Sequence, residues 1–319
     1  MNREDEVEVF HLGEQLLQSR AGVRDQLAEM GSQVIRDHMP DQHRVFFAQR
    51  PFIIIGSMDA AGQPWASILA APPGFISAPD AYRLRIGAVP GISDPLHKSL
   101  VVGADIALLG IEQATRRRNR MNGTVVQLDK DGFDIQVKQS FGNCPKYIQV
   151  RKVGYCERAS AHTAHDTTVL DDRARQIIAR ADTFFIASAH PDANHDATAA
   201  HGIDVSHRGG KPGFVRVDGD DSLTIPDFAG NRFFNTLGNI MLNPRVGLLF
   251  IDFGSGDVVY VAVLATVQFD GVEAYAGAQR LLQCKIQQVR QVRAAVALCW
   301  EVGVEMSPFL QPTGRWNAV

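Results

Sequence analysis

The sequence predicts a mainly β protein with flanking helices, of the α+β class, that contains two tandem copies of a small β-barrel. Three observations predict this class. A set of sequence blocks occurs twice in the same order, Gly, Pro and Asp divide each copy into short apolar runs, and 45% of the 319 residues are hydrophobic. A chain of this length and composition can bury a core in one large domain or two ordinary ones, which excludes disorder of the whole chain.

The internal repeat is the most informative of these observations. Five blocks recur in order and at nearly the same spacing: 52–57 with 184–188, 72–76 with 211–215, 83–86 with 222–225, 106–112 with 246–252, and 125–129 with 266–270. Each match is weak by itself, but five blocks in the same order are hard to obtain by chance. A duplicated domain is therefore the better interpretation.

Each copy has the pattern of short antiparallel strands. The apolar runs alternate with polar residues or are β-branched, and turn-forming residues at 59–62 and 218–221 separate them. About six such strands with one interrupting helix favour closure into a barrel, because closure removes exposed sheet edges.

Helical periodicity predicts the remaining elements. We expect helices over about 14–38, over 166–181, from about Asn231 to Asn243, and from about 272 to 282 or beyond, with another apolar helix that leads to Trp300. In the first copy a shorter helix starts near Asp94 and Pro95. With 139–164 as a linker region, three parts result: an N-terminal helical segment (1–45), a first barrel (46–155), and a second barrel with flanking helices (156–319).

Charge and targeting signals narrow the function classes. Lys and Arg number 32 against 35 Asp and Glu, a net charge of −3, which gives no general drive toward nucleic acid or an anionic membrane. No apolar run is long enough to span a bilayer, and the polar, acidic start is not a signal peptide. We therefore expect a cytoplasmic protein. Its four cysteines form neither a CxxC pair nor a regular framework, so we expect reduced thiols at Cys144, Cys156, Cys284 and Cys299.

The second copy carries a candidate phosphate site. Asp227 belongs to a segment that leads into the predicted helix, whose polar face holds Asn231, Arg232, Asn235, Thr236 and Asn239. Free N–H groups and the positive dipole end of a helix start favour an anion. A solvated helix face capped by Asn231 is the alternative, and periodicity alone favours it.

A second signal lies upstream of that helix. Arg208 precedes Gly209 and Gly210 on a predicted strand, where glycine lets a planar ligand or a phosphate approach the backbone. Arg208 can grip a phosphate bidentately, and His207 beside it can face the same ligand. The glycines are equally compatible with an ordinary turn.

Together these features resemble the pyridoxamine 5'-phosphate oxidase-related FMN-binding split-barrel family. The resemblance covers roughly 46–130 and 180–270, and its most specific block is Asn-Pro-Arg-Val-Gly-Leu-Leu-Phe at 243–250. It implies two tandem FMN-binding split β-barrels that form a pseudo-dimer, with FMN in the groove between them. It also implies that Arg208 on the strand, with Asn235 and Thr236 at the helix start, binds the phosphate.

The chain departs from the oxidase itself in two places. The oxidase usually has a basic pair where Asn235 and Thr236 stand, and Arg232 is a substitute for that charge. The tail 307–316 does not look like the substrate-binding tail of the oxidase. The resemblance therefore supports FMN binding better than oxidation of the vitamin.

The first copy is expected to complete this site rather than to hold a second one. It has Leu69 at the position that matches Arg208. The resemblance places Arg118, with Arg116 as a second candidate, on the strand that reaches the flavin from the other barrel, where a cation stabilises the reduced flavin. A solvated basic edge strand is the alternative explanation.

Two other segments carry chemistry-bearing side chains. Four histidines (His190, His195, His201 and His207) lie among Asp192, Asp196 and Asp204, but their spacing matches no known metal motif, and a loop that happens to be His-rich is favoured over a metal site. The segment around Cys144, Lys146 and Tyr147 either faces a substrate or forms a packed turn.

The resulting expectation is an FMN-dependent oxidoreductase that transfers hydride through flavin N5 to an unknown small molecule. NADH or NADPH is a candidate electron donor, and two chains could pair further. The alternatives are a flavin-binding module without turnover and a haem- or deazaflavin-binding split barrel, since the same architecture hosts both.

Overall fold

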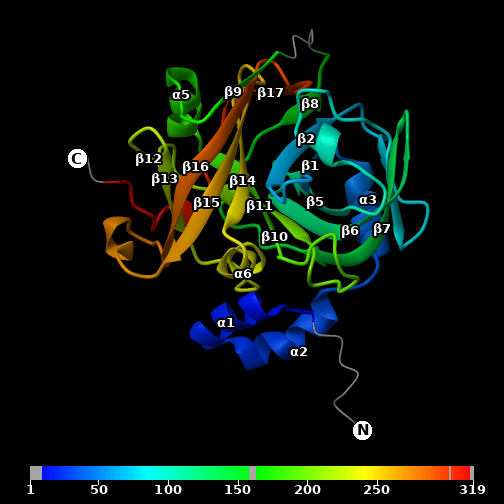
Figure 1. Ribbon diagram of the computed structural model, residues 1–319, viewed down its shortest axis with the longest axis horizontal. Coiled ribbons are helices and arrows are strands. Elements are labelled where there is room, and N and C mark those ends of the chain that lie inside the picture. The colour runs from blue at the N-terminus through cyan, green and yellow to red at the C-terminus, as the bar shows by residue number, and fades with distance from the viewer. Residues whose placement is uncertain (1–8, 158–162, 302, 317–319) are drawn as a thin grey trace.

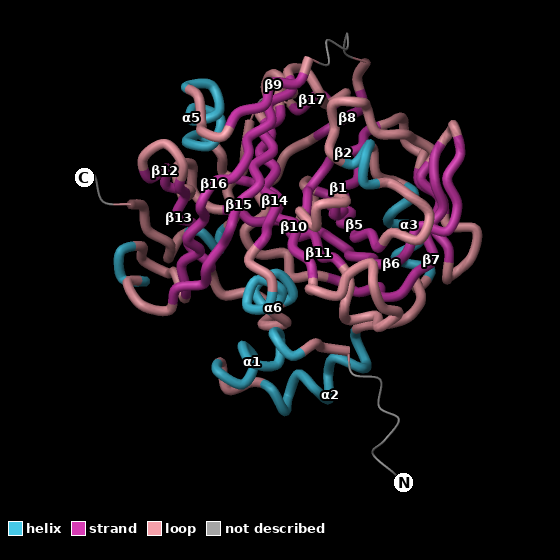
Figure 2. Tube along the Cα trace, in the orientation of Figure 1, coloured by secondary structure: helices cyan, strands magenta, loops and turns pink. Residues whose placement is uncertain are grey.

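The computed structural model describes residues 9–157, 163–301 and 303–316. Strands form most of the regular structure and helices lie around them (Figure 1, Figure 2), so the prediction of a mainly β chain with flanking helices is confirmed. No helix within these ranges is both long and apolar enough to cross a membrane.

The first sheet is antiparallel and has seven strands in the order β2-β1-β5-β6-β7-β4-β3. Its strands are β1 (Phe52–Met58), β2 (Pro64–Ala70), β3 (Ile76–Ser77), β4 (Arg83–Ile86), β5 (Asp105–Glu112), β6 (Arg117–Asp129) and β7 (Gly132–Gly142). The short helix α4 (Leu96–Ser99) follows β4 in the chain. It starts where the sequence predicts, because the Asp94 carboxylate accepts a 2.8 Å hydrogen bond from the Leu96 N–H.

The second sheet repeats this order strand for strand: β11-β10-β14-β15-β16-β13-β12. Its strands are β10 (Thr183–Ala189), β11 (Ile203–Gly209), β12 (Arg216–Asp218), β13 (Ser222–Asp227), β14 (Arg245–Ile251), β15 (Val258–Gln268) and β16 (Arg280–Val292). Helix α6 (Asn235–Leu242) follows β13 just as α4 follows β4. The sequence repeat thus corresponds to two sheets of identical strand order, while the exact domain boundaries stay predictions.

The two sheets pack on one another through a shared apolar core. Phe52, Ile54 and Trp65 of the first sheet belong to the same buried cluster as Phe185 and Val205 of the second. The backbones come very close here, because a Cβ placed on Gly247 of β14 would lie 2.3 Å from the carbonyl oxygen of Pro64 in β2. This packing brings β5 and β6 of the first sheet beside β11 of the second.

The N-terminal segment is helical, but the single helix predicted over 14–38 is wrong. Two helices, α1 (Leu12–Arg20) and α2 (Arg24–Val34), are separated at Gly22, whose φ of +66° is left-handed and interrupts the helix. Both lie beneath α6 (Figure 1), and α3 (Asp41–Ala48) leads into β1.

Helices α1 and α6 cross at two glycines. A Cβ on Gly13 would lie 2.1 Å from the carbonyl oxygen of Gly238 in α6. The missing side chain lets α1 approach the first half of α6, and this contact brings Glu14 of α1 to Asn235, where the two side chains are hydrogen-bonded at 2.5 Å.

The predicted helices near the C-terminus are also wrong. The segment from 280 onward forms β16, and β17 (Leu298–Trp300) precedes the tail, with short 3₁₀ turns at η2 (Val272–Ala274) and η3 (Pro308–Leu310). In β16 the apolar Leu282, Cys284 and Ile286 are buried and alternate with polar residues, the period-two pattern of a strand. The helix predicted over 166–181 shortens to α5 (Asp172–Arg180), because the strand β9 (Ala164–Thr167) pairs with β16 first.

The expectation of four reduced thiols is wrong for two of them. Cys156, which follows β8 (Val153–Tyr155), and Cys299 of β17 form a disulfide, and β8 and β17 make up a separate two-stranded sheet. Cys156 follows β8 directly, and antiparallel pairing brings it close to Cys299 although 143 positions separate them. Cys144 and Cys284 are free thiols.

Candidate anion-binding site

A cleft lies between the two sheets, and its walls come from both. The first sheet contributes β6 and the loop that follows β7, and the second contributes β11, the β13–α6 connection and the start of β16. The structure places eight of the predicted residues on these walls: Arg118, His207, Arg208, Asp227, Asn231, Arg232, Asn235 and Thr236.

The cleft is strongly cationic. Five arginines line it, namely Arg118, Arg120, Arg208, Arg232 and Arg280, and among its described lining residues Asp227 is the one carboxylate. Asp227 is buried between two of them, at 2.8 Å from Arg208 Nη1 and 2.9 Å from Arg280 Nε. Arg120 also pairs with Asp204, so two carboxylates face five guanidinium groups. The remaining positive charge attracts anions.

The excess of positive charge includes a half-buried arginine of β6, Arg118. Burial lowers the pKa of Arg118 to about 10, and the positive charges of Arg120 and Arg208 act in the same direction. The guanidinium of Arg118 donates to the backbone carbonyl of Cys144 at 2.6 Å and lies 3.4 Å from His207 Nδ1, and no described carboxylate pairs with it. An anion in the cleft would supply the negative charge that Arg118 lacks.

Arg120 lies one pleat further along β6 and joins the two sheets. Its Nη1 donates a 2.8 Å hydrogen bond to Asp204 of β11, and Nη2 donates to Ser206. Both Arg120 Nε and Arg208 Nε are buried donors without a protein partner in the described chain. Because unpaired buried donors are costly, these groups favour a ligand with acceptor oxygens.

The start of α6 supplies further donors. The N–H groups of the first helical turn have no partners within the helix and point toward its N-terminal end. Thr236 Oγ1 lies 2.9 Å from Ser206 Oγ, so the hydroxyl groups of α6 and β11 meet there. This arrangement is typical of a phosphate or carboxylate site.

The loop before α6 differs from the prediction. Helix α6 begins at Asn235, so Asn231 and Arg232 belong to a loop rather than to a helical face, and Arg232 has a left-handed φ of +64°. The Asn231 side chain accepts a 3.2 Å hydrogen bond from the Phe233 N–H, which stabilises this loop. Arg232 nevertheless reaches the cleft as an exposed cation.

Three predicted residues lie outside the main cleft. Asn239 lies on the buried face of α6 and donates to Ser188 and Asp204. Arg116 belongs to the turn before β6, with φ +57°, and binds the Ile148 carbonyl and Glu305 instead. The structure therefore does not bring Asn239 and Arg116 to the cleft, because the Asn239 side chain faces the core and Arg116 precedes β6, which starts at Arg117.

Gly209, the third, lines a smaller chamber that shares Arg118, His207 and Arg208 with the cleft. A Cβ on Gly209 would lie 2.0 Å from the carbonyl oxygen of Tyr147, so only glycine lets the 143–148 loop approach β11. The Tyr147 ring faces Phe228 at a centroid distance of 5.2 Å, and Lys146 lines the same chamber. Flat aromatic walls beside cations suit a planar, negatively charged ligand.

The alternative that Arg118 lies on a solvated edge strand is wrong. Strand β6 pairs with both β5 and β7 and is therefore internal to the first sheet. Arg118 and Arg120 point from this internal strand across the boundary between the sheets to His207 and Asp204.

Sequence reasoning missed several residues of the site. Arg280 was missed because a helix was predicted over 272–282. The alternation of the apolar Leu282, Cys284 and Ile286 with polar residues indicates a strand there. Glu14 had no sequence signal at all. Its carboxylate accepts from Asn235 Nδ2 at 2.5 Å and from the His11 N–H at 2.9 Å, and burial raises its pKa well above its usual value.

The equivalent position in the other half of the molecule is closed. The strand registers equate Leu69 with Arg208, Val258 with Arg118, and Tyr260 with Arg120. Instead of a cationic cleft, this position holds a 2.8 Å hydrogen bond from the Tyr260 hydroxyl to the half-buried Asp94, which also accepts a 2.5 Å hydrogen bond from Ser67. Its charge and its packing are both unsuited to an anion.

No protein-family model and no curated protein matches the chain. Among solved structures, a variant of HupZ from Group A Streptococcus is similar over 38% of this chain and 98% of its own, at 9% identity and a TM-score of 0.29. A "putative pyridoxamine 5'-phosphate oxidase" from Lactobacillus delbrueckii is similar over 39% and 94%, at 18% identity and a TM-score of 0.30. An F420 reductase is similar over 35% and 92%, at 13% identity and a TM-score of 0.24. Similarities this low carry nothing about what this chain binds.

Proposed function

We propose that the protein is an FMN-binding flavoprotein that acts as an oxidoreductase on a small molecule, in the manner of the pyridoxamine 5'-phosphate oxidase-related group. The observation that carries the proposal is the cluster of Arg118, Arg120 and Arg208 with Thr236 at the start of α6. Asp204 and Asp227 pair with Arg120 and Arg208, and no described carboxylate pairs with Arg118. FMN combines a phosphate with a large planar ring, and the cleft and its side chamber combine cations with aromatic walls.

The hydrogen-bond donors of this chain fit the phosphate of such a ligand. The buried donors Arg208 Nε and Arg120 Nε lack protein partners in the described chain, and the first turn of α6 adds backbone N–H groups. We assign the phosphate to Arg208, Thr236 and the start of α6, with Arg232 as the exposed additional cation. Arg280 holds Asp227, and Asp227 in turn orients Arg208.

The planar ring belongs, in this proposal, beside Arg118 and the chamber of Tyr147 and Phe228. FMN supplies hydride acceptance and donation at N5 when it is bound. The chain contributes position and electrostatics: Arg118 provides a desolvated positive charge that favours an anionic ligand, and the 143–148 loop closes the chamber on one side.

The site needs one chain only. Strand β6 of the first sheet supplies Arg118 and Arg120, and β11 and α6 of the second supply Arg208 and Thr236. Pairing of two chains is therefore not required for binding, although the proposal does not forbid it.

The decisive experiment is to purify the full chain and identify any bound chromophore by absorption spectrum and mass. We expect a flavin spectrum and the mass of FMN, or saturable binding of added FMN if the protein loses it on purification. A haem Soret band, or a colourless protein indifferent to FMN, contradicts the proposal. Bleaching by NADH or NADPH and recolouring in air then separates an oxidoreductase from a flavin-binding module without turnover.

A further inference from the structure

The His-rich loop between β10 and β11 brings together side chains that the sequence alone could not relate. His190 directly follows β10, and His201 lies two residues before β11. A 3.1 Å hydrogen bond from the His190 N–H to the Gly202 carbonyl closes the loop at its base. Both histidines are therefore held at the same end of the hairpin, beside Asp192.

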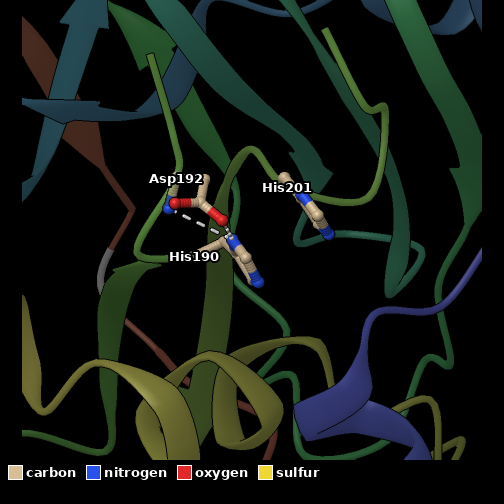
Figure 3. A group of neighbouring side chains, drawn as sticks. All are labelled: His190, Asp192 and His201. Atoms are coloured by element: carbon tan, nitrogen blue, oxygen red, sulfur yellow. Dashed lines mark hydrogen bonds and ion pairs between the residues drawn. The ribbon is translucent and has the colours of Figure 1, made fainter. Parts of the chain in front are cut away.

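The three side chains offer two nitrogens and one carboxylate oxygen. One ligand atom from each of His190, Asp192 and His201 lies within 4.8 Å of the others. Figure 3 shows the Asp192 carboxylate directed toward the His190 ring, with Oδ2 at 3.7 Å from Nδ1. Ligand atoms around a tetrahedral metal with bonds of about 2.0–2.2 Å are roughly 3.3–3.6 Å apart, so the distance of this pair is close to that of two ligands. His190 Nδ1 also accepts a 3.2 Å hydrogen bond from the Asp192 N–H, and a metal ion bound at Nδ1 replaces this hydrogen bond.

The surroundings support these groups as ligands. Asp196 Oδ2 lies 2.7 Å from His201 Nδ1, the carboxylate–histidine contact that commonly orients a metal-binding imidazole. Asn194 fastens the loop to the first sheet through two hydrogen bonds with Asp105, of 2.6 and 2.9 Å. His190 is buried, whereas the Asp192 side chain is 61% exposed, which leaves one side open to water and to an entering ion.

We propose that His190, Asp192 and His201 form a binding site for a divalent transition-metal ion of the Zn²⁺ class. Two imidazoles and a carboxylate, with water in the open position, match the preference of such ions for mixed nitrogen and oxygen ligands. In the structure the two imidazole rings are stacked, with centroids 3.9 Å apart and planes at 4°. Metal binding therefore tilts the partly exposed His201 ring out of this stack.

The test uses the full chain, without a histidine tag, and titration with Co²⁺ as a spectroscopic probe and with Zn²⁺ by calorimetry. We expect one saturable Co²⁺ site with ligand-field absorption, displaced by Zn²⁺. Replacing a ligand in His201→Asn or Asp192→Asn should remove this site. Asp196→Asn, which removes the orienting carboxylate, should weaken binding about 10- to 100-fold.

His195→Asn is the matched control, because His195 is an exposed histidine of the same loop outside the group. It should bind Co²⁺ as the wild type does. Absence of a saturable site in the wild type overturns the proposal, and so does unchanged binding in both His201→Asn and Asp192→Asn, or equal loss in His195→Asn. Because Asp192 is exposed, Asp192→Asn keeps the test valid if a histidine variant fails to fold.

Discussion

The hydroxyl of Tyr260 in β15 donates a 2.8 Å hydrogen bond to the buried carboxylate of Asp94, which precedes α4. By strand register Tyr260 is the counterpart of Arg120, so this bond occupies in one half of the molecule the place that a cationic cleft occupies in the other. Two sheets of the same strand order thus differ in the charge of the side chains at equivalent positions.

Because only one of the two equivalent positions is cationic, we expect each chain to bind one FMN. Calorimetric titration with FMN should saturate at one equivalent, and Tyr260→Phe should leave the affinity unchanged. That substitution should lower the free energy of unfolding by about 1–3 kcal/mol, because Asp94 loses a donor while buried. Tyr275→Phe is the control, since the buried Tyr275 hydroxyl has no hydrogen-bond partner among the described residues. Two equivalents of FMN would contradict the single-site assignment.

Arg208→Ala tests the phosphate assignment. Loss of a charged donor to phosphate should weaken FMN binding by about 2–3 kcal/mol, roughly 30- to 150-fold. Arg175→Ala removes an arginine from α5, where it pairs with Asp220 away from the cleft, and should bind FMN normally. Fluorescence quenching of free FMN measures both affinities. Wild-type affinity in Arg208→Ala would exclude its role in the site.

Arg118→Ala tests the contribution of the first sheet. A cation near the ring stabilises the reduced, anionic flavin, so its removal should lower the two-electron midpoint potential by on the order of 30 mV, which corresponds to about 1.4 kcal/mol. Arg117→Ala is the neighbouring control, because Arg117 points to the Phe46 ring rather than into the cleft. Dye-linked reductive titration measures the potential, and equal values for both variants would reject the role of Arg118.

His207 should make stability depend on pH. Burial, with the positive charges of Arg118 and Arg208, lowers the pKa of His207 well below its ordinary value of 6.5. Below pH 6.5 the unfolded chain therefore binds a proton that the folded chain does not. As the pH is lowered, the free energy of unfolding decreases by up to about 1.4 kcal/mol per pH unit. His207→Gln should remove this contribution between pH 6.5 and 5, as measured by urea unfolding. A smaller slope remains, because burial also lowers the pKa of His11, His43 and His190. The same slope in variant and wild type would show that His207 does not titrate as inferred.

The Cys156–Cys299 disulfide can be checked by counting thiols. Denatured, non-reduced protein should contain two reactive thiols, those of Cys144 and Cys284, and four after reduction. The double substitution of Cys156 and Cys299 by serine should lower the free energy of unfolding by about 2–4 kcal/mol, because a long loop is no longer closed. Cys144→Ser should have a much smaller effect. Four thiols before reduction would show that the bond is absent.

The sequence alone determined the duplicated β architecture and the chemical character of the site. Arg208, Thr236 and Asp227 were identifiable because a cation beside glycines and a polar helix start are local patterns, and local patterns depend on near neighbours in the chain. The position of α6 was predicted for the same reason, apart from its first turn, where the left-handed residues Arg232 and Phe234 delay the helix.

Only the tertiary structure decided which cations share the cleft. Arg120 meets Asp204, and Arg280 meets Asp227, across 84 and 53 positions of the chain, and no periodicity encodes which strand faces which. The Cys156–Cys299 bond, the contact of Glu14 with Asn235 and the meeting of His190 with His201 arise in the same way. Each depends on how strands and helices pack, and packing is a property of distant segments brought together, which the order of residues along the chain does not show directly.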